Sequence, residues 1–93
     1  MTQELLEVLR ETRMFLSRPG NRFGWSQWDN ATDALREIDA FIAQIASGDV
    51  SGRRDLGLLF APTGSIQDVS IDSGWGDEFL ALAARFDAAI ARI

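Results

Sequence analysis

Hydrophobic residues recur every three or four positions in three stretches of the chain, and this spacing predicts three amphipathic helices. The stretches are residues 3–17, 26–47 and 75–92. Thr2 and Ser26 are candidate N-caps for the first two, because hydroxyl side chains accept hydrogen bonds from free amides at a helix start. The middle stretch has the most regular apolar face, with steps of three and four between Trp28, Ala31, Leu35, Ile38, Ile42 and Ile45.

The segment between the second and third helices changes period. Apolar residues alternate with other residues at 55–61, where Leu56, Leu58 and Phe60 share one face of an extended chain, and again at 67–72. Pro62 to Ser65 supply turn formers between them, so the pattern predicts a β-hairpin. We therefore expect an α+β fold in the order helix, helix, strand, strand, helix, in one domain covering residues 1–93.

Length and charge restrict the function. The chain has 93 residues and a net charge of −5, which suits one acidic domain. A negative surface repels a phosphate backbone, so we expect no nucleic-acid partner and favour a basic protein as partner. The longest apolar runs are too short to cross a bilayer and the first residues are acidic, so we expect a cytoplasmic protein without membrane contact.

Several reactive side chains are absent from the composition. The chain contains no His, no Cys, no Lys and no Tyr, so all nine basic residues are Arg. The commonest general base, thiolate nucleophile and soft metal ligands are therefore missing. We expect no catalytic residues, no cofactor and no metal.

The acidic residues do not change this expectation. Asp68, Ser70 and Asp72 are spaced like the first ligands of a calcium loop, but Ser73 and Phe79 stand where such a loop needs Gly and Glu. A carboxylate pair for acid–base chemistry would need one raised pKa in an apolar cleft, which remains open from sequence.

Aromatic residues gather in two loops rich in glycine. We expect a partner-binding surface there, since Trp and Arg are the usual hot-spot residues of protein interfaces. The candidate residues are Arg22, Phe23, Trp25, Asp72, Trp75 and Asp77. The alternative is that the rings close the ends of a small core.

Two further patterns leave choices open. Four arginines (Arg10, Arg13, Arg18, Arg22) could form an anion patch, but pairing with Glu4, Glu7 and Glu11 on the same helix is the plainer interpretation. Four alanines (Ala81, Ala84, Ala88, Ala91) follow the back of the last helix, where they would let another helix approach closely, within the chain or across a homodimer.

The stretch from Leu59 to Ile71, followed by Ser73 to Phe79, resembles the central segment of small uncharacterised acidic bacterial proteins. Some proteins of this general kind are immunity partners of bacterial toxins. The resemblance implies no catalytic residue. We therefore expect a non-enzymatic protein-interaction domain, of immunity type or a regulatory inhibitor. A small-ligand-binding or carboxylate-dependent enzyme and a self-associating structural module are the alternatives.

Overall fold

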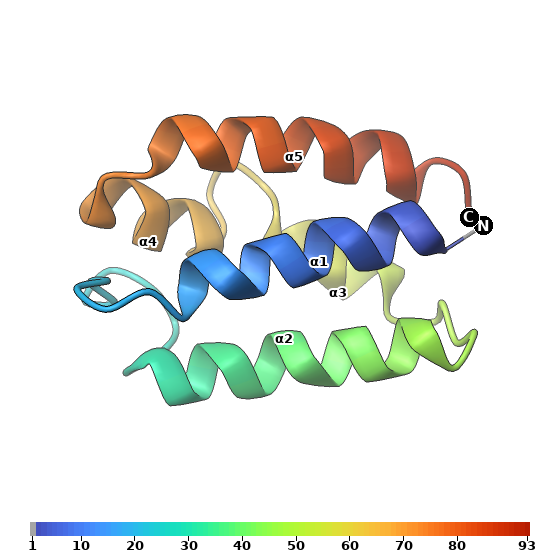
Figure 1. Cartoon of the computed structure of the whole chain (residues 1–93), viewed down its shortest axis with the longest axis horizontal. Helices are drawn as coiled ribbons and strands as arrows, with labels where there is room; N and C mark the ends of the chain where they lie inside the picture. The colour runs from blue at the N-terminus through green and yellow to red at the C-terminus, as the bar shows by residue number, and fades with distance from the viewer. Residues whose placement is uncertain (1) are drawn as a thin grey trace.

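The computed structural model describes residues 2–93, and this part of the chain folds into five helices without a strand (Figure 1). They are α1 (Gln3–Leu16), α2 (Ala31–Ala46), α3 (Arg53–Leu59), α4 (Ser65–Ser73) and α5 (Gly76–Ile90). α2, α1 and α5 lie side by side in one layer, with α1 in the centre, and α3 and α4 lie behind that layer. α1 contacts α2 and α5, and α4 contacts α5. The chain is thus all-helical, and the predicted α+β class is wrong.

The three helices predicted from hydrophobic spacing are confirmed, although one of them starts later than expected. α2 begins at Ala31, because the Oδ1 atom of Asn30 accepts a hydrogen bond of 3.0 Å from the Asp33 amide and caps the helix. Ser26, the predicted cap, instead donates its hydroxyl to the Phe23 carbonyl at 2.9 Å. The residues before Asn30 therefore form a loop rather than a first helical turn.

The predicted β-hairpin at residues 55–61 and 67–72 is wrong, because both segments are helical. Each buries residues at helical spacing: Leu56, Leu59 and Phe60 in or beside α3, and Ile66, Val69 and Ser70 in α4. Leu58 and Ile71, which strand alternation would place on the buried face, are 63% and 62% exposed. The period of these segments is therefore that of a helix.

Two glycines allow the short connections on either side of α4. Gly74 ends α4 with φ of +86°, a left-handed conformation that other residues rarely adopt, and the chain turns directly into α5. Gly64 precedes α4 at a point where its backbone packs directly against the backbone of Leu58 and Leu59. A Cβ atom there would lie 2.5 Å from the Leu59 carbonyl oxygen and 2.7 Å from that of Leu58. The connection from α3 to α4 can close this tightly only without a side chain.

The core is rich in aromatic residues from the second half of the chain. The rings of Phe60 and Phe86 stack with their centroids 4.2 Å apart, and Phe79 lies 6.4 Å from Phe60 on the same measure. The buried hydroxyl of Thr12 donates to the Val8 carbonyl at 2.8 Å. Among the described residues, no buried side-chain nitrogen or oxygen lacks a hydrogen-bond partner. The buried polar side chains are therefore satisfied by hydrogen bonds.

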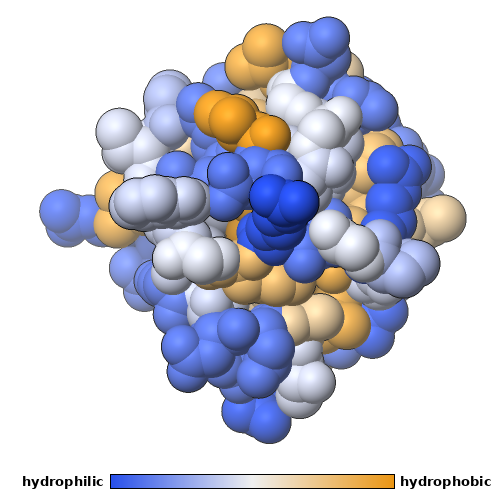
Figure 2. All heavy atoms as spheres, turned by 90° about the vertical axis from the view of Figure 1, so that its left-hand side faces the viewer, coloured by the Kyte–Doolittle hydropathy of each residue, from blue (hydrophilic) through white to orange (hydrophobic). Residues whose placement is uncertain are grey.

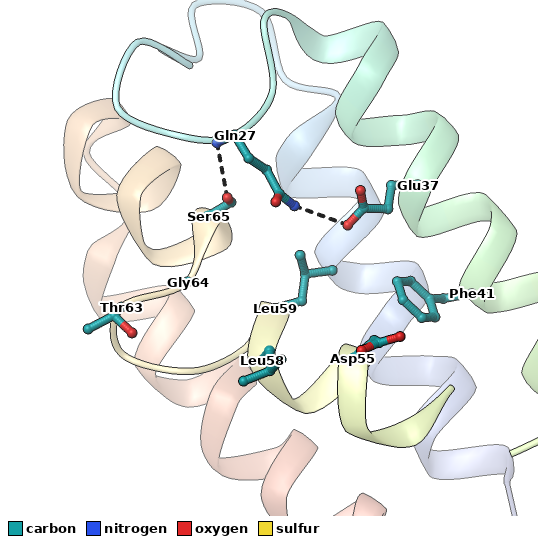
Figure 3. Close-up of a pocket in the computed structure, with 9 residues that line it drawn as sticks. All are labelled: Gln27, Glu37, Phe41, Asp55, Leu58, Leu59, Thr63, Gly64 and Ser65. Carbon is teal, nitrogen blue, oxygen red and sulfur yellow. Dashed lines mark hydrogen bonds between the residues drawn. The ribbon is translucent and has the colours of Figure 1, made fainter. Parts of the chain in front are cut away.

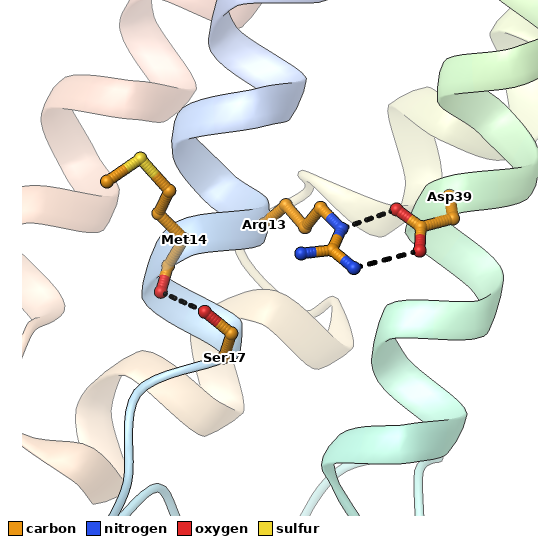
Figure 4. A network of polar contacts seen from close by, with 4 residues as sticks. All are labelled: Arg13, Met14, Ser17 and Asp39. Carbon is orange, nitrogen blue, oxygen red and sulfur yellow. Dashed lines mark hydrogen bonds and ion pairs between the residues drawn. The ribbon is translucent and has the colours of Figure 1, made fainter.

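Three ion pairs join α1 to the parts of the chain on either side of it. Arg13 on α1 binds Asp39 on α2 through two hydrogen bonds, of 2.6 and 3.1 Å (Figure 4). The other two are Arg85–Glu11 at 2.6 Å, between α5 and α1, and Arg92–Glu4 at 2.9 Å, which joins the residues that follow α5 to α1. Glu4 and Glu11 thus pair with arginines from the C-terminal part of the chain, not with those of α1 as the sequence suggested. All of these side chains are partly exposed, so each pair stabilises the fold by at most about 1 kcal/mol.

Candidate functional site

The loop between α1 and α2 is fastened along the length of α4. The amide of Arg22 donates to the Ser73 hydroxyl at 2.8 Å, and the amide of Gln27 donates to the Ser65 hydroxyl at 3.1 Å. Ser65 and Ser73 are the first and last residues of α4. Residues 21–28, which we call the strap, therefore run antiparallel to α4 and are held at both ends.

The conformation of the strap directs Trp25 into solvent. Ser26 closes a turn, since its hydroxyl donates to the Phe23 carbonyl at 2.9 Å and accepts from the Trp28 amide at 3.2 Å. Phe23 packs half-buried against the core and Trp28 is buried. Trp25, between them, is 81% exposed, the most exposed of the large hydrophobic residues described. An indole this exposed on a fixed segment contributes nothing evident to the core and is available for contact.

Trp75 fixes the beginning of the strap from inside. Its ring is 2% exposed and stacks on Phe15 with centroids 4.9 Å apart. Its Nε1 atom donates to Oδ1 of Asn21 at 2.9 Å, and Nδ2 of Asn21 donates to the Phe15 carbonyl at 2.7 Å. Arg18 lies over the Phe15 ring, with its guanidinium carbon 4.0 Å from the centroid. This cluster joins the end of α1, the strap and the start of α5.

The residues predicted to bind a partner thus divide into two groups. Arg22, Trp25, Asp72 and Asp77 are exposed, whereas Phe23 is half-buried and Trp75 is buried. The two predicted loops do meet, because the strap is bonded to Ser73 beside Asp72. Trp75 therefore positions the strap and does not itself offer a contact surface.

Exposed apolar residues also occur outside the strap. Leu80 on α5 is 63% exposed and Met14 on α1 is 68% exposed, while Ile71 on α4 is exposed beside Gly76. Figure 2 shows the end of the molecule at the left of Figure 1, where apolar residues form separate patches between hydrophilic ones. The alanines expected to pack on the back of the last helix are exposed: Ala81, Ala84, Ala88 and Ala91. They do not pack within the chain.

A groove of about 350 Å³ opens beside the strap, and it is not among the sites predicted from the sequence (Figure 3). α2 contributes Glu37 and Phe41, and Gln27 from the strap closes one side. The remaining lining residues are Asp55, Leu58, Leu59, Thr63, Gly64 and Ser65, from α3 and the connection to α4. We call this the α2–α3 groove.

The α2–α3 groove is lined by both apolar and acidic residues. Glu37 and Asp55 are the ionisable residues that line it, and both are acids. Glu37 is held in place by neutral donors: Nε2 of Gln27 lies 3.2 Å from its Oε2, and the Trp28 indole nitrogen lies 3.5 Å from its Oε1, a weak bond. Neither acid is in an ion pair among the described residues, whereas Glu4, Glu11 and Asp39 are.

One part of this groove could be anticipated from sequence. Glu37 and Phe41 are four residues apart in the predicted second helix, so they share a face. The other wall was hidden, because Asp55 and Leu58 belong to a segment that was interpreted as a strand. On a helix they lie three residues apart, and both line the groove (Figure 3).

Other charged and apolar features lie outside the strap and the groove. Within residues 2–93 no three acids gather closely enough to hold a metal ion. The four ionisable groups with displaced pKa values are Glu11, Arg13, Asp49 and Arg85, all outside the strap and the groove.

No helix in the described part of the chain combines the length and the apolar character needed to cross a membrane. No known protein family, curated protein or solved structure matches the chain.

Proposed function

We propose that this chain is a non-enzymatic protein-interaction domain that binds a basic partner protein through the strap. The observation that carries the proposal is Trp25, whose indole is 81% exposed on a segment hydrogen-bonded to α4 at both ends. Exposed indoles are costly to keep in water and are over-represented among the residues that dominate binding energies. The fixed strap also lowers the entropy lost when a partner orders this surface.

Charge supports a basic partner. The chain carries −5 overall, and Asp72 and Asp77 are exposed on the two helices that meet beside the strap. A negative surface accelerates encounter with a positive one and disfavours acidic competitors. Binding of a basic toxin as an immunity protein, or of a basic enzyme as a regulatory inhibitor, in the cytoplasm, is the specific form of function that we propose.

The test begins with identification of the partner. Tagged wild-type chain and Trp25→Ala are used in parallel to capture proteins from the native cell, and the product of each neighbouring gene is co-expressed with the chain. The candidate is then purified and titrated by calorimetry. Trp25→Ala should weaken binding about 30-fold, the value of an interface hot spot of roughly 2 kcal/mol.

Met14→Ala is the matched control, because Met14 is 68% exposed on α1 but lies outside the strap. It should change the affinity less than about twofold, as a surface substitution outside an interface does. A partner that binds wild type and Trp25→Ala equally well would refute the strap as the binding surface. Rescue of growth in cells that express the partner distinguishes the immunity form from the inhibitor form.

Self-association is a second candidate, favoured by the exposed apolar surface of α5. Ala81, Ala84 and Ala88 are exposed on this helix, and Leu80 beside them is 63% exposed. Sedimentation at micromolar concentration tests it, with Ala84→Glu as the variant that should abolish a dimer formed through α5. A wild-type chain that sediments as a monomer excludes this candidate.

A further inference from the structure

The α2–α3 groove combines an aromatic ring, two carboxylates and two leucine side chains. Phe41 is half-buried, so one part of its ring remains open to the groove. Glu37 lies one helical turn before it on α2, and Asp55 on α3 lies beside the ring (Figure 3). Leu58 and Leu59 form the apolar part of the opposite wall.

These groups match the chemistry of one side chain. A guanidinium is planar, stacks on aromatic faces, and donates hydrogen bonds in its plane to carboxylates on either side. Its aliphatic stem can lie along apolar residues while the charged head reaches polar groups. Phe41, the acids Glu37 and Asp55, and Leu58 all line the groove and together offer partners for all three parts.

We propose that the α2–α3 groove holds an arginine side chain of the basic partner protein. This inference rests on the proposed function and names the chemistry that the partner must present. Charge complementarity selects the occupant, since the ionisable residues lining the groove are both acids and neither is in an ion pair among residues 2–93. Lysine would satisfy the carboxylates but would stack less well on Phe41.

The groove is continuous with the surface that carries Trp25. Gln27 lines the groove and is two residues from Trp25. The backbone amide of Gln27 is hydrogen-bonded to the hydroxyl of Ser65, another lining residue. The Gln27 side chain also orients Glu37 through the bond of 3.2 Å. A partner that covers the strap therefore passes the mouth of the groove, where one of its arginines can enter.

A short peptide tests the groove without the natural partner. The probe is the blocked pentapeptide acetyl-Gly-Ser-Arg-Ser-Gly-amide, with peptides carrying citrulline or lysine in place of arginine for comparison. Each is titrated into the ¹⁵N-labelled chain and followed by amide chemical shifts. The arginine peptide should shift the amides of Gln27, Phe41 and Gly64 most, and the citrulline peptide should leave them unchanged.

Two double variants of equal charge show whether the effect is local. E37Q/D55N should weaken binding of the arginine peptide roughly fivefold to tenfold, as expected for the loss of two exposed ion pairs. E78Q/D87N removes two exposed acids of α5 that do not line the α2–α3 groove. It should change the affinity less than about twofold, because long-range attraction between exposed charges is screened.

In the titration with the arginine peptide, the inference is overturned if the amides at the groove do not shift or if shifts spread over all acidic surfaces. It is also overturned if both double variants weaken peptide binding equally, or if the lysine peptide binds as tightly as the arginine peptide. Free arginine binding more tightly than the peptide would also overturn it, since the occupant would then be a small ligand. The Trp25→Ala titration addresses the proposed function separately. Loss of the peptide signal with a retained Trp25 effect refutes the groove alone.

Discussion

The indole Nε1 of Trp75 donates a hydrogen bond of 2.9 Å to Oδ1 of Asn21, a residue 54 positions earlier in the chain. The bond links the start of the strap to the junction between α4 and α5. Trp75 is 2% exposed, so water cannot replace Asn21 as its partner without a rearrangement. The position of the strap, and with it the outward orientation of Trp25, depends on this contact.

Asn21→Ala should destabilise the fold by about 1–3 kcal/mol, because it leaves a buried indole N–H without an acceptor. Trp75→Phe removes the donor while retaining an aromatic ring against Phe15. The free energies of unfolding from urea titrations of the two single variants and the double variant form a cycle. The double variant should be more stable than the sum of the single effects predicts, by about 0.5–1.5 kcal/mol. Strictly additive effects would mean that the bond contributes nothing.

Tryptophan fluorescence should separate one solvent-exposed indole from two buried ones. Trp25 is 81% exposed, whereas Trp28 and Trp75 are 4% and 2% exposed. Iodide should therefore quench a red-shifted part of the emission, and Trp25→Phe should remove that part. The same variant should alter the free energy of unfolding by less than about 0.5 kcal/mol, as is usual for surface substitutions. A quencher-resistant spectrum for all three indoles would remove the aromatic partner surface.

The helices with long periodic seams could be predicted from sequence, and the short ones could not. α1, α2 and α5 have 14, 16 and 15 residues, enough turns for the apolar spacing to identify a period. α3 and α4 have seven and nine. Over such lengths, positions i and i+4, such as Leu56 and Phe60, share a face in a helix and in a strand alike. Leu58 and Ile71 made alternation look complete, because no sequence pattern shows that an apolar residue is exposed.

The candidate site was predictable only where it depended on local signals. Trp25 and Trp75 both lie beside glycines in loops, and the sequence does not distinguish the exposed ring from the buried one. The difference arises from Asn21 and Phe15, which reach Trp75 across the fold. The groove escaped prediction for the same reason, since its walls come from α2 and α3 and meet only through tertiary packing.

Two glycine-to-alanine substitutions should have opposite effects on stability. Gly64→Ala places a Cβ atom 2.5 Å from the Leu59 carbonyl oxygen and 2.7 Å from that of Leu58, so backbone must move. We expect a loss of about 1–3 kcal/mol, comparable to overpacking of a core. Gly57→Ala lies inside α3 with nothing within 4 Å of the new atom, and should stabilise the chain by about 0.5–1 kcal/mol. Thermal and urea unfolding of both variants measure the change in the free energy of unfolding relative to wild type.

The sign of the Gly57→Ala effect also tests the secondary structure. Alanine is a poor strand former, so the full helical gain would not be expected if residues 55–61 were a strand. A destabilised Gly57→Ala together with a neutral Gly64→Ala would contradict both the helical α3 and its tight connection to α4. The far-ultraviolet circular dichroism of each variant, compared with wild type, shows whether helix content follows stability.

The ion pair between Glu11 and Arg85 should make stability depend on pH in the acid range. The hydrogen bond from Arg85, of 2.6 Å, lowers the pKa of Glu11 from its ordinary value of 4.5, against a smaller opposing effect of burial. Because the pKa is lower in the folded state, the stabilisation is complete above about pH 4.5 and disappears as the pH falls through the folded pKa. Both side chains are nearly half exposed, so Glu11→Gln should cost less than about 1 kcal/mol at pH 7. Urea titrations at pH 7, 5, 4 and 3 should show this difference shrink as the pH falls below 4.5. In the Arg85→Ala background Glu11→Gln should have no effect at any of these pH values, and a difference that persists there would assign the acid dependence to another group.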